Sequence, residues 1–228
     1  MFLYFLELMG LGDHGDLTWY CQVIAKNGGD EKKLRTLFTD DLQVSFEKLV
    51  FFSQEKKAAL QKKLLKKVIK FFISDVVDVL PDKAHFLTDV VERVVAMSGS
   101  SLRLVRYSFT FVGLYLYKCL LYHIKDLALL KQQLDTKRKN ELRLKQDNST
   151  TAEQLLAITQ AYEIVKAAAH ALQNRILIKR STDSYDLIRK SVFEFLLQLD
   201  ANEVSIAFSK DNVEVLDMVF NSLRDDDF

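Results

Sequence analysis

The sequence predicts an all-α protein, and three observations lead to that fold class. The 228 residues include one proline and seven glycines, which leaves little turn chemistry for a β fold. The segments that break helices lie at helix-length intervals along the chain. Apolar residues make up 49% of the chain and charged residues 28%, so the chain can bury a sizeable core. We therefore expect long helices packed against one another.

The first 52 residues are expected to form N-terminal helices. Loops at Gly10–Gly15 and Asn27–Asp30 separate them, and Asp16 and Asp30 can cap the helices that follow. The opening segment, MFLYFLELMG, has no basic residue ahead of its apolar stretch, so it does not match a signal peptide. Its pattern fits a helix whose beginning is missing, and we expect the chain to be a fragment of a longer protein.

A lysine-rich helix is predicted next, from Ser53 to the Val79–Asp82 segment that contains the one proline. Seven lysines and one glutamate lie within Glu55–Lys70. At about 100° per residue, one side of this helix is expected to be apolar, with Leu60, Leu64, Leu65, Val68, Ile69 and Phe72. The opposite side is expected to hold Lys62, Lys63, Lys66, Lys67 and Lys70 in solvent. This lysine stripe is either a solvated helix face or a surface that binds a polyanion.

A long helical hairpin is predicted at about residues 102–178. A shorter helix, from Asp82 to about Met97, and a break at Ser98–Ser101 come before it. The first hairpin helix runs to about Gln146 and is apolar in its first half and charged in its second. A helix that leaves the core halfway along its length has this composition. The turn is expected at Asp147–Thr151, after which a second long helix returns.

Shorter helices are predicted in the tail, at residues 182–199, 202–208 and 212–223. Paired amphipathic helices of 15–25 residues are typical of a HEAT-type α-solenoid. The fold class predicted from the sequence is thus an all-α, HEAT-like α-solenoid of antiparallel helix pairs, with one long protruding helical hairpin.

The sequence gives no sign of an enzyme or of a cofactor. It contains none of the glycine-rich phosphate loops, nucleophile elbows or HExxH zinc motifs that mark common catalytic sites. The four histidines have no metal-ligand spacing with each other or with the cysteines. Cys21 and Cys119 lie in apolar contexts and are expected to be buried free thiols. No apolar run reaches the ~18 residues of a membrane span, so no membrane partner is predicted.

Four local patterns, in order, resemble the stromalin (STAG, stromal antigen) family, the HEAT-repeat subunit of cohesin. Ser100–Tyr107 is similar to the family's S-x-V-R-x-F-R-H run, which opens a long helix. Lys179–Arg189 is similar to the H-R-Y-R-D-x-x-x-x-I-R run that starts the stromalin conservative domain. Lys62–Leu64 stands where the family has Lys-Lys-Phe. The charged excursion at Lys125–Lys145, with its returning helix, resembles the family's protruding hairpin.

The resemblance covers about residues 54–228 and implies a domain organisation. Residues 53–180 correspond to the STAG-like helical region, and residues 181–228 to a truncated start of the stromalin conservative domain. The chain departs from the family in three places. Tyr107 replaces a histidine, the hairpin excursion is shorter, and Asn221 stands where the family has a tryptophan on a surface that binds aromatic-containing peptides. The last change weakens the expectation of regulatory-partner binding at that surface.

What the resemblance implies is a non-catalytic subunit of a chromosome-tethering complex in the nucleus. Such a subunit binds double-stranded DNA, supports cohesin loading, sister-chromatid cohesion and chromosome segregation in the cell cycle, and docks on the kleisin subunit. The kleisin contact is expected mostly outside this chain, and the cohesin loader and regulators are further possible partners. An open alternative is a helical-repeat scaffold that binds proteins or acidic membrane surfaces without binding DNA.

Two basic clusters are the candidate DNA-binding sites. The first is the lysine stripe defined above, whose ammonium groups could neutralise phosphates without reading bases. The second, at the end of the hairpin, consists of Lys137, Arg138, Lys139, Arg143 and Lys145; it is otherwise a solvated hairpin tip. Arg103 and Arg106, three residues apart at a helix start, are expected to pair with nearby acidic residues or loop carbonyls, or alternatively to contact phosphate.

Overall fold

The computed structural model describes residues 56–81, 84–100, 103–144, 149–207 and 217, and these residues form helices without a strand. In chain order the helices are α4 (Lys56–Asp78), α5 (Ala84–Ser98), α6 (Arg103–Arg143), α7 (Ser149–Leu172), the π-helical η2 (Gln173–Ile178), α8 (Lys179–Ser181), α9 (Asp186–Leu196) and α10 (Ala201–Ala207). The expected N-terminal helices lie outside the described residues, and so does the predicted helix at 212–223 except for residue 217. The all-α helical-repeat fold is confirmed.

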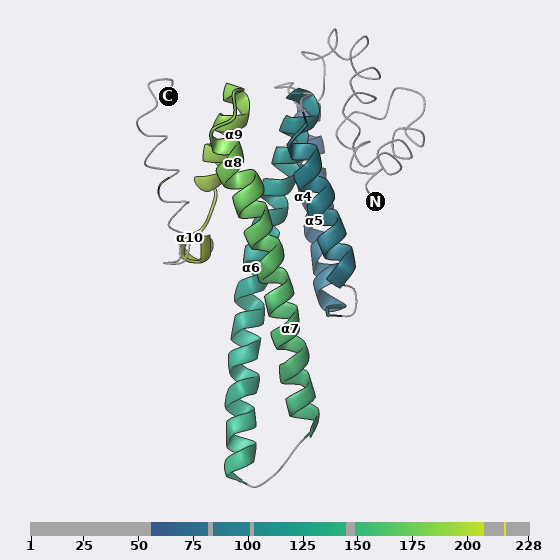
Figure 1. Ribbon diagram of the computed structural model, residues 1–228, viewed down its shortest axis with the longest axis vertical. Helices are drawn as coiled ribbons and strands as arrows, with labels where there is room; N and C mark the ends of the chain where they lie inside the picture. The colour runs from purple at the N-terminus through teal and green to yellow at the C-terminus, as the bar shows by residue number, and fades with distance from the viewer. Residues whose placement is uncertain (1–55, 82–83, 101–102, 145–148, 208–216, 218–228) are drawn as a thin grey trace.

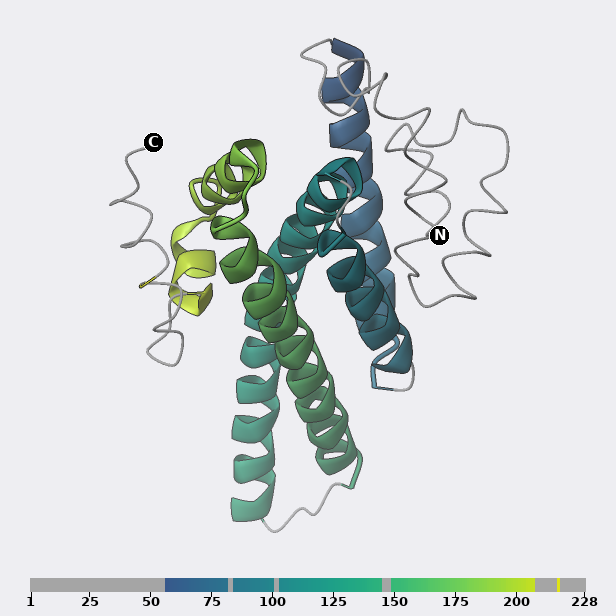
Figure 2. The same ribbon diagram turned by 45° about the horizontal axis from the view of Figure 1, so that its top comes forward.

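Helices α6 and α7 form the long hairpin, which projects away from the other helices (Figure 1). The antiparallel pair α4 and α5 flanks the root of the hairpin on one side, and α8 to α10 flank it on the other (Figure 2). Helix α6 contacts α4, α5, α7, η2, α9 and α10, so it is the central element of the fold. Its observed bounds lie within a few residues of those predicted.

The core surrounds the first half of α6. Residues 105–127 of α6 supply an almost continuous set of buried side chains, of which Phe109, Tyr117 and Leu120 are fully covered. Helices α4, α5, α7 and η2 each pack one face against α6. The buried residues of these faces include Leu65, Ile69, Ile73, Leu87, Val91, Val165, Leu172 and Ile176. Beyond Leu127, the residues of α6 are exposed or only partly buried. The hairpin therefore leaves the core where its sequence changes from apolar to charged.

Gly113 lets the helices approach closely at the root of the hairpin. A Cβ atom at this position would collide with Cδ1 of Ile176 and lie 3.2 Å from Cγ1 of Val94. A larger residue would therefore displace the Ile176 side chain of η2 and crowd Val94 of α5. The absence of a side chain at residue 113 therefore leaves room for Ile176 and Val94 to pack against α6.

The predicted apolar side of α4 was wrong at two positions. Leu60 and Leu64 were expected to face the core, but 63% and 43% of their surfaces are exposed. The buried face instead follows Leu65, Ile69 and Ile73 and continues through the second half of the helix, which lies deeper against α6. Because that half fixes the rotation of the whole helix, the first leucines turn outwards.

Cys119 is buried, as predicted, whereas Cys21 lies outside the described residues. Burial raises the pKa of the Cys119 thiol to about 12, so at neutral pH it is protonated and unreactive. No helix in the part of the chain that the structure describes combines the length and the apolarity that a bilayer crossing requires.

A buried ion-pair cluster centred on Asp183 joins the start of α6 to the corner between α8 and α9. Oδ2 of Asp183 lies 3.1 Å from Nε of Arg106 and accepts a hydrogen bond of 2.9 Å from Nη1 of Arg180. The backbone carbonyl of Asp183 accepts a hydrogen bond from Nη1 of Arg189, also at 2.9 Å. Arg106 donates in addition to the carbonyl of Ser100, at 2.9 Å. One carboxylate thus links segments about eighty residues apart in the sequence.

The same aspartate explains why α9 is shorter than predicted. The helix was expected over residues 182–199 but is observed over Asp186–Leu196. Oδ1 of Asp183 accepts a hydrogen bond of 3.0 Å from the backbone N–H of Tyr185, which is the local turn that aspartate favours. The backbone at residues 182–185 is therefore held out of the helix.

Replacing Asp183 by asparagine is expected to destabilise the protein by about 3 kcal/mol. The substitution removes the negative charge that two largely buried guanidinium groups contact, and breaking a buried pair on one side leaves a buried charge uncompensated. Urea unfolding followed by circular dichroism measures the change.

The matched control is Asp135→Asn, because Asp135 makes a solvent-exposed i,i+4 pair with Lys139. That variant is expected to lose about 0.5 kcal/mol or less. Equal losses in the two variants would show that the Asp183 cluster does not hold the fold together.

Candidate nucleic-acid interface

The lysine stripe of α4 divides into two rows in the structure. Lys63, Lys67 and Lys70 are exposed, as predicted. Lys62 and Lys66 are partly buried at the border with α6 and α9, which differs from the expected position in open solvent. The cause is the rotation of α4 described above, which turns the stripe towards its neighbours. Three ammonium groups therefore extend into solvent, and two lie along a groove.

Aromatic rings and one carboxylate surround the two groove lysines. Nζ of Lys66 lies 5.2 Å from the ring centre of Tyr115 and 5.6 Å from that of Phe111, both within cation–π range. A cavity of about 220 Å³ lies between α4, α6 and α9, and Lys62, Lys66 and Glu194 line it together with aromatic side chains. The groove lysines therefore help to pack α4 on α6.

Burial lowers the pKa of both groove lysines. For Lys62, desolvation is opposed by the negative charge of Glu194. For Lys66, desolvation is reinforced by the positive charges of Lys118 and Lys62. Like charges therefore converge on this groove, and an added anion would relieve their repulsion.

The basic cluster at the hairpin tip is less strongly positive than its cations alone suggest. Lys137 and Arg143 are exposed, Arg138 is partly buried, and Lys145 lies outside the described residues. Lys139 is exposed, and its Nζ pairs with Asp135 at 2.6 Å. Glu141, also on this segment, accepts a hydrogen bond of 3.0 Å from Oγ1 of Thr151. Residues 135–143 hold four cations and two carboxylates, which leaves a net charge of +2.

Arg106 makes the pairing with an acidic residue and a loop carbonyl that the sequence predicted, and Arg103 contacts an aromatic ring. Arg106 belongs to the buried cluster around Asp183. The guanidinium carbon of Arg103 lies 5.6 Å from the ring centre of Tyr185, within cation–π range. Both side chains thereby fasten the start of α6 to the segment before α9.

The two basic clusters lie far apart along the molecule. Lys66 faces Phe111 and Tyr115 in the first half of α6, whereas the tip residues lie near the end of that helix. At 1.5 Å per residue, the separation along α6 is about 40 Å. The structure brings together the five stripe lysines but does not bring the tip cluster to them (Figure 1).

The described ranges hold no candidate metal site. No group of three or more histidine, cysteine, aspartate or glutamate side chains among residues 56–81, 84–100, 103–144 and 149–207 could hold a metal ion.

Sequence reasoning missed the aromatic partners of the groove lysines. Phe111 and Tyr115 are four residues apart, so they share one face of α6, and this spacing was a usable signal. Lys118 was missed as well. Its Nζ donates a hydrogen bond of 2.6 Å to the carbonyl of Gln198 and lies 3.4 Å from Oε2 of Glu203, partners 80 or more residues away that no local pattern reveals.

The described geometry is that of a helical-repeat protein with basic faces. Residues 47–158 match the family model of the STAG domain, a range that includes all of α4, α5 and α6 and the start of α7. The matched part of the chain is therefore similar to the STAG domain, which confirms the resemblance to the stromalin family found in the sequence. Proteins of this family are structural cohesin subunits, so the match indicates a cohesin-related role. A search of curated proteins found no match to the chain.

Replacing Lys66 by glutamate is expected to destabilise the fold by about 1 kcal/mol. The change removes the cation from the rings of Phe111 and Tyr115 and adds a carboxylate to the cavity that Glu194 lines. Urea unfolding of Lys66→Glu and of the neighbouring exposed Lys67→Glu makes the comparison, and Lys67→Glu should change stability by at most about 0.5 kcal/mol. Equal stability of the two variants would rule out a packing role for Lys66.

Proposed function

We propose that this chain is a non-catalytic, cohesin-related subunit that binds duplex DNA without sequence preference through the exposed row of α4. The row consists of Lys63, Lys67 and Lys70, with Lys62 and Lys66 behind it in the groove. The observation that carries the proposal is this row of lysines on a packed helix inside the STAG domain match. The tip cluster is a second, weaker contact.

The charge pattern of α4 supports binding to phosphates. Its first acidic residue is Asp75, five residues after Lys70, so the turns of α4 that carry the stripe contain no carboxylate. Lysines that contact DNA phosphates release condensed counterions, and each contact contributes about −0.9 to the slope of log K against log salt. Three contacts by the exposed row give a slope of about −2.7, and contacts by all five lysines give about −4.5. Such contacts position the protein on DNA without reading bases.

The wider role follows from the family. STAG-domain proteins are structural cohesin subunits, which supports roles in cohesin loading, sister-chromatid cohesion and chromosome segregation. We further propose a nuclear, chromatin-associated location and a kleisin contact that lies mostly outside this chain, with the cohesin loader and regulators as other partners. The domain limits at residues 52 and 180 also belong to this proposal.

An alternative function is a scaffold that binds protein partners or acidic membrane surfaces. The observation that favours it is the exposed apolar surface of Leu60, Leu64 and Phe71, which share the solvent side of α4 with Lys63 and Lys67. A helix face that is both apolar and cationic suits an anionic lipid surface as well as a nucleic acid. Binding to anionic vesicles, measured beside binding to DNA, separates the two functions.

The double variant Lys63→Glu/Lys67→Glu is expected to weaken DNA binding at least tenfold. It removes two phosphate contacts, and its salt slope should fall in magnitude by about 1.8. The measurement is fluorescence anisotropy with ~30-base-pair duplexes of unrelated sequence over a salt series.

The matched control is Lys179→Glu/Lys190→Glu, which makes the same change in net charge at two exposed lysines outside both clusters. If the control loses as much affinity as the test variant, binding depends on net charge and not on the α4 row. If wild-type protein binds anionic vesicles more tightly than either duplex at equal salt, the scaffold function is favoured.

Charge reversal at the hairpin tip, in Lys137→Glu/Arg143→Glu, is expected to weaken DNA binding by no more than about threefold. The cations of the tip are partly neutralised by Asp135 and Glu141, and the tip lies far from the α4 row. The DNA affinity of this variant is measured by fluorescence anisotropy over the same salt series. A loss as large as that of the α4 variant would make the hairpin tip the main DNA contact.

A further inference from the structure

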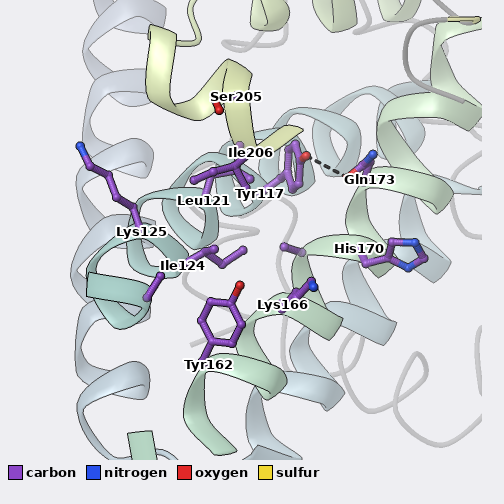
Figure 3. A pocket seen from close by; sticks show the side chains of 12 residues that line it. Tyr117, Leu121, Ile124, Lys125, Tyr162, Lys166, His170, Gln173, Ser205 and Ile206 are labelled. Carbon is purple, nitrogen blue, oxygen red and sulfur yellow. Dashed lines mark hydrogen bonds between the residues drawn. The ribbon is translucent and has the colours of Figure 1, made fainter. Parts of the chain in front are cut away.

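A cavity of about 660 Å³ lies where the hairpin leaves the core, between α6, α7 and α10 (Figure 3). Tyr117, Leu121 and Ile124 of α6 form one wall, Tyr162 and Lys166 of α7 form another, and Ser205 and Ile206 of α10 lie across the top of the view. Its volume is within the range of ligand pockets, about 300–1,000 Å³. The basic clusters proposed to bind DNA include none of these residues.

A hydrogen bond closes the inner end of the cavity. The hydroxyl of the buried Tyr117 donates to Oε1 of Gln173 at 3.1 Å, so both polar groups are satisfied. Gln173 is the first residue of η2, the π-helical segment that interrupts the regular α-helix after α7. Single π-helical turns are rare and are frequent at functional sites. This segment places the Gln173 side chain against Tyr117 of α6, at the inner end of the cavity.

The floor of the cavity is apolar and its edge is cationic. Leu121, Ile124 and Ile206 supply the apolar surface. Lys125 of α6 and Lys166 of α7 are exposed and line the cavity from opposite walls. No aspartate or glutamate is among the lining residues that the structure describes. No carboxylate of the lining neutralises these lysines, and Asp200, just before α10, interacts electrostatically with Lys125 from outside it.

A third cation lies next to this edge. Nζ of Lys131 is 5.1 Å from the ring centre of Tyr162, a lining residue. The lysine covers the aromatic face at the side of the hairpin that leads to the tip. A ligand that entered here would meet apolar surface below and positive charge around it.

We propose that this cavity is a docking site for an acidic peptide segment of a partner protein, which inserts one large apolar side chain between α6 and α7. Carboxylates flanking that side chain complement Lys125 and Lys166, and the apolar side chain covers the floor. Duplex DNA is the less suitable ligand, because phosphates can satisfy the lysines but leave the apolar floor uncovered. The proposal does not depend on DNA binding by α4.

The test begins with a phage-displayed library of random 12-residue peptides selected on the whole chain. The tightest binder is then synthesised with a fluorescein label, and its affinity is measured by anisotropy. We expect selected peptides to share a leucine, methionine or phenylalanine with aspartate or glutamate within two or three residues of it. Selection of basic peptides, or of none above background, would overturn the proposal.

Two pairs of variants locate the site. Ala128→Trp fills the cavity from an exposed position on its lining, and Ala167→Trp makes the same change at an exposed position of α7 outside it. The first should weaken peptide binding at least tenfold and the second should leave it unchanged.

Lys125→Glu/Lys166→Glu should also weaken peptide binding about tenfold, whereas Lys179→Glu/Lys190→Glu should leave it unchanged. If Ala128→Trp binds the peptide as tightly as wild type does, the peptide does not bind in this cavity.

Two further outcomes identify other occupants. If an unlabelled 30-base-pair duplex displaces the peptide, and Lys125→Glu/Lys166→Glu weakens DNA as much as peptide, the cavity belongs to the DNA surface. If light scattering shows a dimer that Ala128→Trp converts to a monomer, a second copy of this chain fills the cavity. Either result would overturn the peptide site, while loss of DNA binding in Lys63→Glu/Lys67→Glu alone would leave it standing.

Discussion

The arrangement of the other elements depends on the ion pairs and hydrogen bonds made by the buried Asp183. It holds Arg106 near the start of α6 and Arg180 in α8, and its backbone carbonyl holds Arg189 in α9. Because α6 contacts most of the other described helices, fixing its start fixes their common axis. The aspartate also sets the turn before α9 through Tyr185, so local backbone geometry and long-range packing depend on one side chain.

The orientation of α4 shows how core packing decides which charges reach solvent. The lysines of its first half occupy a broad arc, but the buried residues of the second half set the rotation of the helix. Lys63, Lys67 and Lys70 consequently extend outwards, while Lys62 and Lys66 lie against α6 and α9. The surface proposed to bind DNA is thus determined by how the far end of the same helix packs.

Most of the fold could be predicted from the sequence, because proline and glycine are scarce and the breaks that do occur end helices close to where they were expected. The bounds of the hairpin followed from the breaks at Ser98–Ser101 and Asp147–Thr151, and its departure from the core followed from the change from apolar to charged composition. The rotation of α4 could not be predicted, since Leu60 and Leu64 fit the helical period of the apolar side as well as the leucine that is buried. Only the contact with α6 decides which side of the helix is buried. The cavity could not be predicted either, because its walls come from residues 117–206 and meet only in the folded chain. Family resemblance indicated the arginines and the aspartate of the buried cluster, but not that Arg106 joins them.

Helix α6 is a single helix of 41 residues, buried in its first half and projecting in its second. From Leu127, its last buried residue, to its end at Arg143 the projection is about 24 Å at 1.5 Å per residue. Because the hairpin projects this far from the core, tilting it by about 5° at its base would move its tip by about 2 Å. The cavity between α6, α7 and α10 lies where the hairpin leaves the core, so a ligand bound there would contact both hairpin helices at their common base.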